Sequence, residues 1–280
     1  MTTLTLEKYQ NELKNLTTNE FEKELLAASL KNLISKDNKL RFNNFAYGIR
    51  ELSRHILLSL APNDQVEKCC WYKNESKKPD NTTRAEKIKY AIQKGLPDYF
   101  VETFYDTEDH IYLIKETLEV LNKFTHVNSD TFDLSDHKLD ILSSEVLNTF
   151  RDFAFGIKEF NKLFKKELEE HIDKVVMEHT IEETFDEIDI LSTHHNVEEH
   201  ETSSYDILEI DSQYIQIEAK GNLSVRQQYG SDGDFAKGDG FEMYSSFPFE
   251  CNISIKINKD FTKSEYKTLN FSVDTDSWYE

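Results

Sequence analysis

The 280-residue sequence lacks long apolar runs and has few cysteines, and these two shortages narrow the kinds of protein it can be. No stretch approaches the roughly 20 consecutive apolar residues that a membrane-spanning helix needs. The N-terminal sequence MTTLTLEKYQNELKN lacks the basic-then-apolar order of a secretory signal peptide. Three cysteines, two of them adjacent at Cys69 and Cys70, form neither a disulfide framework nor the ligand spacing of a zinc site. We therefore expect a soluble protein of the reducing cytoplasm that has no membrane partner.

Metal-ligand spacings are also missing. His194, His195 and His200 do not have the spacing of the two histidines and the glutamate on a zinc-hydrolase helix. The stretch SDGDFAKGDG resembles a calcium-binding loop, but counting from Asp232 its sixth position is Lys237, where an EF-hand needs glycine. The sequence predicts no bound metal and no other cofactor.

The charge of the chain is strongly negative but unevenly divided. Its net charge of −20 argues against a nucleic-acid partner, because phosphate binding needs Lys and Arg. Residues 1–100, however, hold 17 Lys and Arg against 13 Asp and Glu, and the remaining 180 residues hold 16 against 40. The mildly basic N-terminal part is therefore expected to meet RNA or DNA, with an acidic surface that merely keeps the protein soluble as the alternative.

Apolar residues recur at helical spacing through most of the first 180 residues. They predict helices over about 17–36, 41–61, 83–94 and 107–124. Thr17 and Glu20 have the order of a capping box, Pro62 ends the second helix, and Gly95 is expected to cap the third. From Asp136 to about Thr180 the spacings are three and four only, which predicts a helix of roughly 60 Å. Such a helix has to pack against another part of its own domain or against a second copy of the protein. We favour a homodimer in which part of this helix forms the contact between the two copies.

After Tyr205 the pattern changes to the alternation typical of β-strands. Turn residues at 211–212, 221–222 and 231–240 divide it into about five antiparallel strands. The expected fold class is α+β. It comprises an all-α bundle with a long helix over 1–180, an acidic linker over 181–204 and an antiparallel β domain over 205–280.

The helix predicted over 41–61 carries the side chains best suited to chemistry. Arg50 and Arg54 lie one above the other on its outward side, and His55 lies roughly 140° around the axis from Arg50. A histidine can take the proton of a ribose 2′-hydroxyl, and an arginine can stabilise the charge that grows on the scissile phosphate, without a metal ion. The 140° offset means that a second helix must face this one before the two groups can act together.

Further basic and aromatic residues follow this helix. Lys73 lies beside Trp71 and Tyr72, an arrangement that can stack bases and hold phosphates. Arg84 and Lys87 lie on the short helix predicted over 83–94, and we assign Arg54, Lys73, Arg84, Lys87 and His126 to nucleic-acid binding. A Trp71 that fills the core and a His126 that caps a helix are the structural alternatives.

The segment Arg50-Glu-Leu-Ser-Arg-His55 resembles the Arg-x4-His motif of HEPN ribonucleases. This resemblance implies an all-helical HEPN-like domain whose motifs pair across two protomers, with Arg50 and His55 as catalytic residues.

A second resemblance extends over nearly the whole chain. The segments FAYGIRELSRH, WYKNE, TRAEKIKYAIQKG, FTHVN, VRQQYGSDGDFAKGDG and SFPFECN are similar to a bacterial family of predicted nucleases associated with prokaryotic PIWI proteins. It implies a nuclease effector in antiphage defence, together with a defence-system partner protein.

Two other functions remain open. In restriction-endonuclease-like folds, an acidic residue followed by a Glu-x-Lys segment binds a divalent metal and cuts DNA. The chain has this order at Asp206, Glu218 and Lys220. Alternatively, the protein is a non-catalytic module of a defence complex, in which Arg50 merely pairs with a carboxylate such as Glu51.

Overall fold

The computed structural model describes residues 3–74, 82–182 and 185–279. The chain forms two compact units, Met1–Leu163 and Phe164–Glu280. The first is helical and the second contains an antiparallel sheet, so the predicted α+β class is confirmed. Among the described residues, no helix carries an apolar segment long enough to cross a lipid bilayer.

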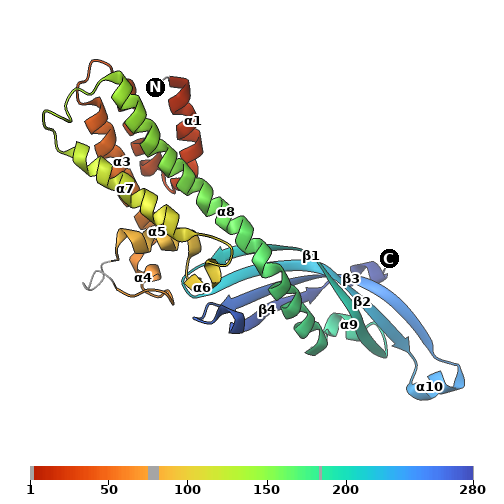
Figure 1. Cartoon of the computed structure of the whole chain (residues 1–280). Helices are drawn as coiled ribbons and strands as arrows, with labels where there is room; N and C mark the ends of the chain where they lie inside the picture. The colour runs from red at the N-terminus through yellow and green to blue at the C-terminus, as the bar shows by residue number, and fades with distance from the viewer. Residues whose placement is uncertain (1–2, 75–81, 183–184, 280) are drawn as a thin grey trace. The chain divides into compact units, whose positions relative to one another are not determined.

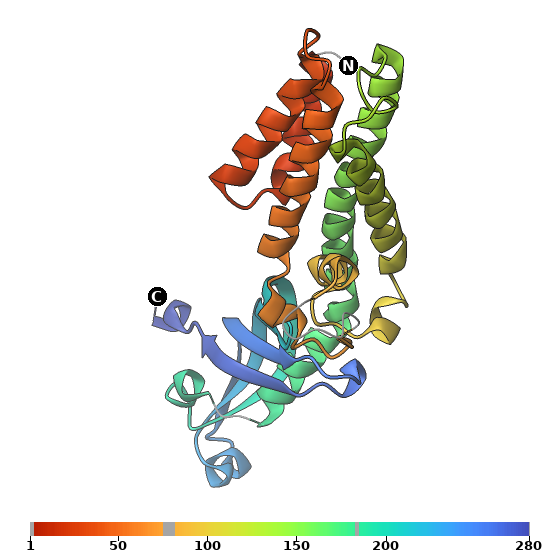
Figure 2. The same ribbon diagram turned by 90° about the vertical axis from the view of Figure 1, so that its left-hand side faces the viewer.

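The first unit is a bundle in which α3 is central. Its elements are α1 (Thr3–Leu13), η1 (Lys14–Leu16), α2 (Glu20–Ile34), α3 (Arg41–Leu60), α4 (Asn63–Val66), α5 (Arg84–Gln93), α6 (Asp98–Val101), α7 (Thr107–Thr125) and the first part of α8 (Asp136–Glu182). α3 packs against α2, α5 and α7, and α1 lies beside α2 (Figures 1 and 2).

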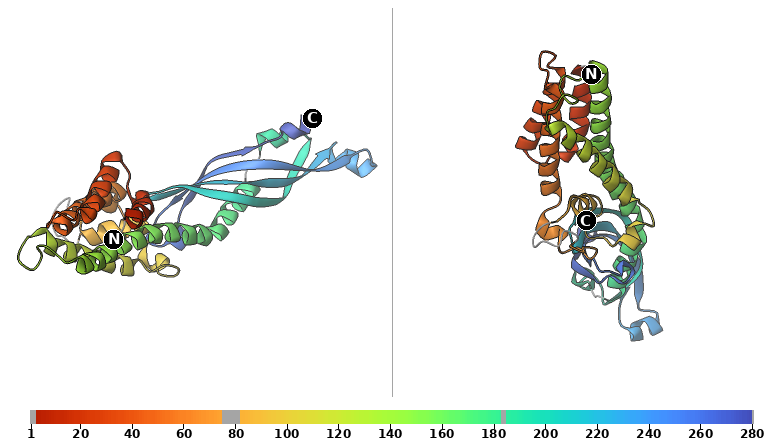
Figure 3. Two further views of the ribbon diagram at one scale, coloured as in Figure 1. Left: turned by 90° about the horizontal axis from the view of Figure 1, so that it is seen from above. Right: turned by 60° about the vertical axis from the view of Figure 1, so that its left-hand side comes forward.

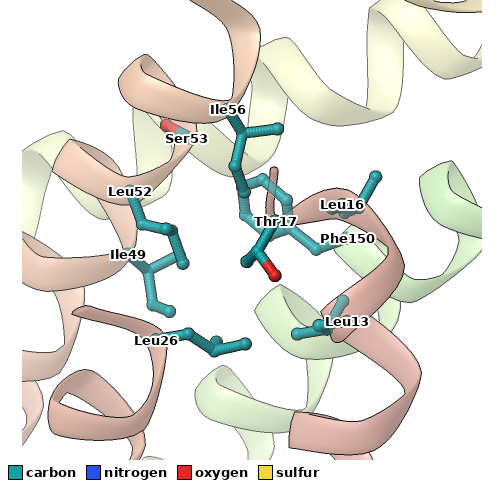
Figure 4. Close-up of a pocket in the computed structure, with 9 residues that line it drawn as sticks. All are labelled: Leu13, Leu16, Thr17, Leu26, Ile49, Leu52, Ser53, Ile56 and Phe150. Carbon is teal, nitrogen blue, oxygen red and sulfur yellow. The ribbon is translucent and has the colours of Figure 1, made fainter. Parts of the chain in front are cut away.

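The apolar stripe of α3 faces the core of this bundle. Ile49, Leu52 and Ile56 are buried together with Leu26 of α2 and Phe150 of α8 (Figure 4). The space left between them is only about 10 Å³, which is room for at most one water molecule. The prediction of a helix over 41–61 with one buried stripe is confirmed, and the opposite side of α3 is exposed or partly exposed.

Two predicted helix ends were wrong in detail. α2 begins at Glu20 with Asn19 as its N-cap, because the Asn19 side chain accepts from the backbone N–H of Glu22; Thr17 does not cap it. The reciprocal capping box lies instead between Thr83 and Glu86, at the start of α5. Lys94, with φ of 53°, takes the C-cap position of α5 that we predicted for Gly95.

The apolar seam of α8 is buried by its own chain. Nine of its eleven predicted positions are buried, namely 139, 146, 150, 153, 160, 164, 168, 172 and 175. The positions up to 160 belong to the first unit and the others to the second. The seam therefore needs no second copy to cover it, and a homodimer would have to use another surface.

The second unit contains a four-stranded antiparallel sheet in the order β1-β2-β3-β4, with the second part of α8 along one face (Figures 1 and 3). Its elements are α9 (Asp186–Asp189), β1 (His194–Ile210), β2 (Tyr214–Tyr229), α10 (Asp232–Lys237), β3 (Phe241–Lys256), η2 (Phe261–Lys263), β4 (Tyr266–Val273) and η3 (Asp276–Tyr279). Alternate residues of β2, such as Ile217, Ala219 and Leu223, form its core.

The turn predicted at 211–212 separates β1 from β2, but the start of β1 and the continuity of β2 differ from the prediction. β1 begins at His194, so residues 194–204, which we assigned to the linker, form more than half of this strand. β2 runs without interruption through the predicted turn at 221–222, so four strands replace the expected five in the described part of the chain. Part of the calcium-like stretch 231–240 forms the short helix α10.

Candidate functional site

One side of α3 carries a continuous series of partly or fully exposed side chains, which we call the α3 outer stripe. It consists of Tyr47, Arg50, Glu51, Arg54, His55 and Leu58. Arg50 and His55 are half-buried at its two margins, as the predicted 140° offset requires, and Arg54 is exposed between them.

A chain of polar contacts joins the two predicted catalytic residues. Arg50 Nη2 donates to Glu51 Oε1 at 2.9 Å, and Arg54 Nε donates to Glu51 Oε2 at 3.1 Å. Arg54 Nη2 lies 2.9 Å from Nε2 of His55. Glu51 thus holds both guanidinium groups, and one of them reaches the histidine.

These contacts favour the charged form of Glu51 and bear on the tautomer of His55. Hydrogen bonds from Arg50 and then from Arg54 hold the pKa of Glu51 below its ordinary value. Because an arginine is always a donor, Nε2 of His55 has to accept from Arg54, which leaves the proton of a neutral imidazole on Nδ1. His55 therefore presents the lone pair that a general base needs, although Arg54 covers it in this conformation.

Aromatic side chains border both ends of this contact chain. The ring of Phe21 on α2 meets the His55 imidazole edge-on at 5.0 Å between centroids. The Arg50 guanidinium lies 5.9 Å from the centroid of the Tyr47 ring. Phe21 is 54% exposed, Tyr47 57% and Leu58 41%, so large apolar groups surround the charged residues at the surface.

The start of α2 positions Phe21 beside His55. Ser59 of α3 donates a 2.7 Å hydrogen bond to Glu22 Oε1, while the backbone N–H of Thr18 donates to Oε2 of the same carboxylate at 2.7 Å. Burial alone would raise the pKa of Glu22, but the hydrogen bonds from Thr18 and Ser59 outweigh burial and lower it. A buried carboxylate therefore ties the first turn of α2 to the last turn of α3.

The structure does not bring His126 to this site. His126 is the exposed C-cap of α7, which agrees with the capping alternative. Two residues earlier, the Phe124 carbonyl accepts a hydrogen bond from Asn43 near the start of α3. Asn43 precedes His55 by 12 residues, which is about 18 Å along the helix axis.

The predicted phosphate-binding residues separate into exposed and buried groups. Arg84 and Lys73 are exposed. Lys87 is buried and its ammonium group donates to the Ala61 carbonyl at 2.9 Å and to Asn63 Oδ1 at 2.6 Å, so it is not available to a phosphate in this structure.

Trp71, which precedes Lys73 by two residues, is part of the core. Trp71 is 9% exposed, as expected for the alternative in which it fills the core, and its Nε1 donates to the Lys94 carbonyl at 2.8 Å.

Beside Trp71 lies a hollow of about 240 Å³, and Lys73, Lys89 and Lys115 are among the residues that line it. Two further lysines of this loop, Lys77 and Lys78, lie outside the described residues.

The alternative metal site has part of the geometry that it needs. Asp206 of β1 and Glu218 of β2 are direct partners in the antiparallel register. The Lys220 ammonium, however, lies 3.3 Å from Glu218 and 2.8 Å from Glu250, and Asp206 pairs with Lys165 at 2.9 Å. Within the described ranges, no group of three or more His, Cys, Asp or Glu side chains is placed to hold a metal ion.

Sequence reasoning named Glu51 only as a carboxylate that could pair with Arg50, and it missed Phe21 and Tyr47 in this site. The spacing of Glu51 and Arg54, three residues apart on a helix, was a signal for their ion pair. The contact between Phe21 and His55 joins two helices, and no local pattern predicts it.

Comparison with known proteins gives one result for both parts of the chain. No curated protein and no solved structure matches it. Residues 13–150 match one family model and residues 157–279 match a second, and both carry the description "Predicted pPIWI-associating nuclease". Together the two matches span both compact units, so the chain belongs to the family of predicted pPIWI-associating nucleases.

Proposed function

We propose that this protein is a metal-independent endoribonuclease of a bacterial antiphage system, with Arg50 and His55 as its catalytic residues. Membership of the family supports a nuclease. The observation that carries the finer proposal is the contact chain from Arg50 through Glu51 and Arg54 to Nε2 of His55. It joins an imidazole to two guanidinium groups at a partly exposed surface, which is what cleavage of RNA without a metal needs.

The reaction follows from these groups. A scissile phosphate attracts the Arg54 guanidinium, which leaves Nε2 of His55 free to accept the proton of the adjacent 2′-hydroxyl. The 2′-oxygen then bonds to phosphorus, the bond from phosphorus to the 5′-oxygen breaks, and the leaving oxygen takes a proton from water. Arg50 stabilises the charge on the phosphate oxygens in the transition state. Arg84 and Lys73 bind the phosphates that flank this site.

The α3 outer stripe also supports a homodimer. Tyr47 and Leu58, with Phe21 beside them, are large apolar side chains exposed around the charged residues. Two copies facing each other through this stripe would cover these side chains and would set Arg50 of one copy opposite His55 of the other. We expect Leu58→Asp to convert the dimer to a monomer in light scattering, with a parallel loss of cleavage. A wild-type protein that is monomeric at assay concentrations and still cuts RNA would contradict this arrangement.

The central test is RNA cleavage in the presence of EDTA. Wild type is expected to cut single-stranded RNA under these conditions. His55→Ala and Arg50→Ala should lose at least about a hundredfold of the rate, because each removes a group that acts on the transition state. His137→Ala, which alters an exposed histidine of α8, is the matched control. Cleavage by folded His55→Ala at the wild-type rate would disprove the assignment.

A metal-dependent DNase is the second candidate, because Asp206 and Glu218 are partners in the strand register and Lys220 follows on the same strand. It requires a divalent cation to displace Lys165 and Lys220 from these carboxylates. DNA cleavage that depends on Mg²⁺ or Mn²⁺ and is lost in Lys220→Ala would favour this site over α3.

A non-catalytic module that binds a prokaryotic PIWI protein is the third candidate. Its supporting observation is that Arg50 does pair with Glu51. A purified protein that cuts neither RNA nor DNA, with or without metal, but co-purifies with a PIWI protein would favour this function.

A further inference from the structure

The second unit contains a hollow that the proposed nuclease site does not use. It has a volume of about 250 Å³ and lies between the second part of α8, the end of β3 and the segment that leads from η2 into β4. Its lining combines the aliphatic side chains of Val175 and Ile255 with five polar or aromatic residues: His171, Lys174, Phe261, Ser264 and Tyr266.

The charge of this hollow is opposite to that of its surroundings. Residues 164–280 hold 10 Lys and Arg against 27 Asp and Glu, a net charge of −17. Lys174 nevertheless lines the hollow, and none of the lining residues is a carboxylate. Among the side chains that the structure describes, the Lys174 ammonium pairs with Glu178 at 3.7 Å, in an exposed pair that contributes little stability. An anionic ligand in the hollow can therefore compete with Glu178 for the Lys174 ammonium.

The walls of the hollow favour an anion that carries an aromatic ring. The His171 imidazole lies 6.2 Å from the buried ring of Phe261, with 29° between the two planes, and Tyr266 adds a third, exposed ring. Aromatic side chains of this kind stack on the faces of nucleobases.

The wall of the hollow also contains the hydroxyl group of Ser264. Oγ of Ser264 is buried and has no hydrogen-bond partner among the described residues. A buried hydroxyl without a partner costs free energy, and rotation about one side-chain bond can turn it toward a ligand. Ser264 thus offers a donor within the same hollow as Lys174.

From these features we infer that the hollow in the second unit binds a mononucleotide, with the base against His171 and the phosphate on Lys174 and Ser264. The volume of about 250 Å³ is slightly below the roughly 300 Å³ at which typical small-molecule sites begin, which limits the ligand to about the size of one nucleotide. The negative charge of the second unit repels a long polyanion strongly. It repels a ligand with only one or two charges much less. The nucleotide is free in solution or is the phosphorylated end of a nucleic-acid chain. The site is separate from the proposed nuclease function, which can fail without affecting it.

The test is equilibrium binding to the full-length chain. The probes are AMP, adenosine, inorganic phosphate and the 5′-monophosphate of 2-aminopurine riboside, whose fluorescence is quenched on stacking. AMP is expected to bind at least about tenfold more tightly than adenosine or phosphate, and the fluorescent nucleotide should be quenched. A 5′-phosphorylated deoxydinucleotide that binds like AMP would assign the site to chain ends, and one that binds at least tenfold more weakly would assign it to free nucleotides.

Two variants and one matched control locate the ligand. Lys174→Gln should weaken AMP binding about tenfold or more, and Ser264→Ala should weaken it severalfold. Lys166→Gln alters an exposed lysine of the same helix that does not line the hollow and should leave the affinity unchanged. Circular dichroism confirms that each variant is folded. The inference is overturned if AMP does not bind at about 5 mM, if adenosine binds as tightly as AMP, or if folded Lys174→Gln binds AMP like wild type.

Discussion

Lys87 and Arg84 lie three residues apart on α5, but their side chains have opposite environments. Arg84 is exposed, whereas the Lys87 ammonium is buried against the Ala61 carbonyl and Asn63. Burial lowers the pKa of Lys87, with the negative charge of Glu67 opposing that effect. From sequence the two residues looked equivalent as phosphate ligands, and only their packing separates them.

This difference gives a paired prediction. Lys87→Ala should lower the free energy of unfolding by about 1–3 kcal/mol, because it removes the buried packing of the side chain and leaves the Ala61 carbonyl without this donor. Arg84→Ala should change stability by less than about 0.5 kcal/mol. Urea denaturation measures both.

Binding to RNA should show the reverse order. Using 2′-O-methyl RNA, which lacks the attacking hydroxyl, we expect Arg84→Ala to weaken binding and folded Lys87→Ala to leave it unchanged. Equal losses of affinity in the two variants would contradict the assignment of Lys87 to structure.

The junction between α2 and α3 depends on one buried carboxylate. Hydrogen bonds from Thr18 and Ser59 lower the pKa of Glu22 below its ordinary value of 4.5 despite its burial. Since the folded-state pKa is the lower one, the stabilisation by Glu22 is complete above about pH 4.5 and is lost as the pH falls through the folded-state value.

We therefore expect Glu22→Gln to be about 1–3 kcal/mol less stable than wild type at pH 7, with a difference that shrinks below pH 4.5. Denaturation at a series of pH values measures this. Glu24→Gln, an exposed change on the same helix, should keep the wild-type pH dependence. A stability difference that stays constant down to the acid transition would rule out the titration of Glu22 as its cause.

The same two helices approach closely at Gly48. A Cβ added there would lie 2.1 Å from Oγ of Ser29 and 3.0 Å from its Cβ, both on α2. We expect Gly48→Ala to destabilise the protein by about 1–3 kcal/mol even though alanine favours helix formation. Thermal unfolding of the single and double variants measures this. The cost should fall in a Ser29→Ala background, which removes the nearest atom, and an unchanged cost there would show that the strain has another source.

The elements with a long apolar period were predictable, and those defined by tertiary contacts were not. α3, α7 and α8 end within about two residues of the predicted positions, because each repeats one buried stripe over many turns. Gly221 looked like a turn residue. It lies instead inside β2, where a Cβ would meet the Glu201 carbonyl at 2.0 Å, so this glycine allows close strand packing.

At the candidate site, too, the contacts that depend on tertiary packing could not be predicted from the sequence. The helix period placed Arg50 and His55 at the margins of one exposed face, and the structure confirms this placement. Local spacing could not show that Arg54 reaches His55 or that Phe21 lies against its ring, because rotamers and helix packing decide both contacts.

At the scale of the whole molecule, charge divides the chain into a part suited to nucleic acid and a part that opposes it. Residues 1–100 have a small positive balance within a first unit of net charge −3, whereas residues 164–280 carry a net charge of −17. A long RNA is therefore expected to contact only the first unit, through few phosphates, and the acidic unit limits non-specific binding.

This division predicts a shallow dependence of RNA binding on salt. If Arg50, Arg54, Lys73 and Arg84 each neutralise one phosphate of a single strand, the logarithm of the association constant should fall with the logarithm of salt concentration with a slope of about −3. Arg84→Ala should make the slope shallower by about 0.7, whereas Lys166→Ala in the acidic unit should not change it. Fluorescence anisotropy with 2′-O-methyl RNA at a series of salt concentrations gives these slopes. A slope much steeper than −3 would require phosphate contacts outside these four residues, and a slope near zero would exclude backbone binding by the α3 face.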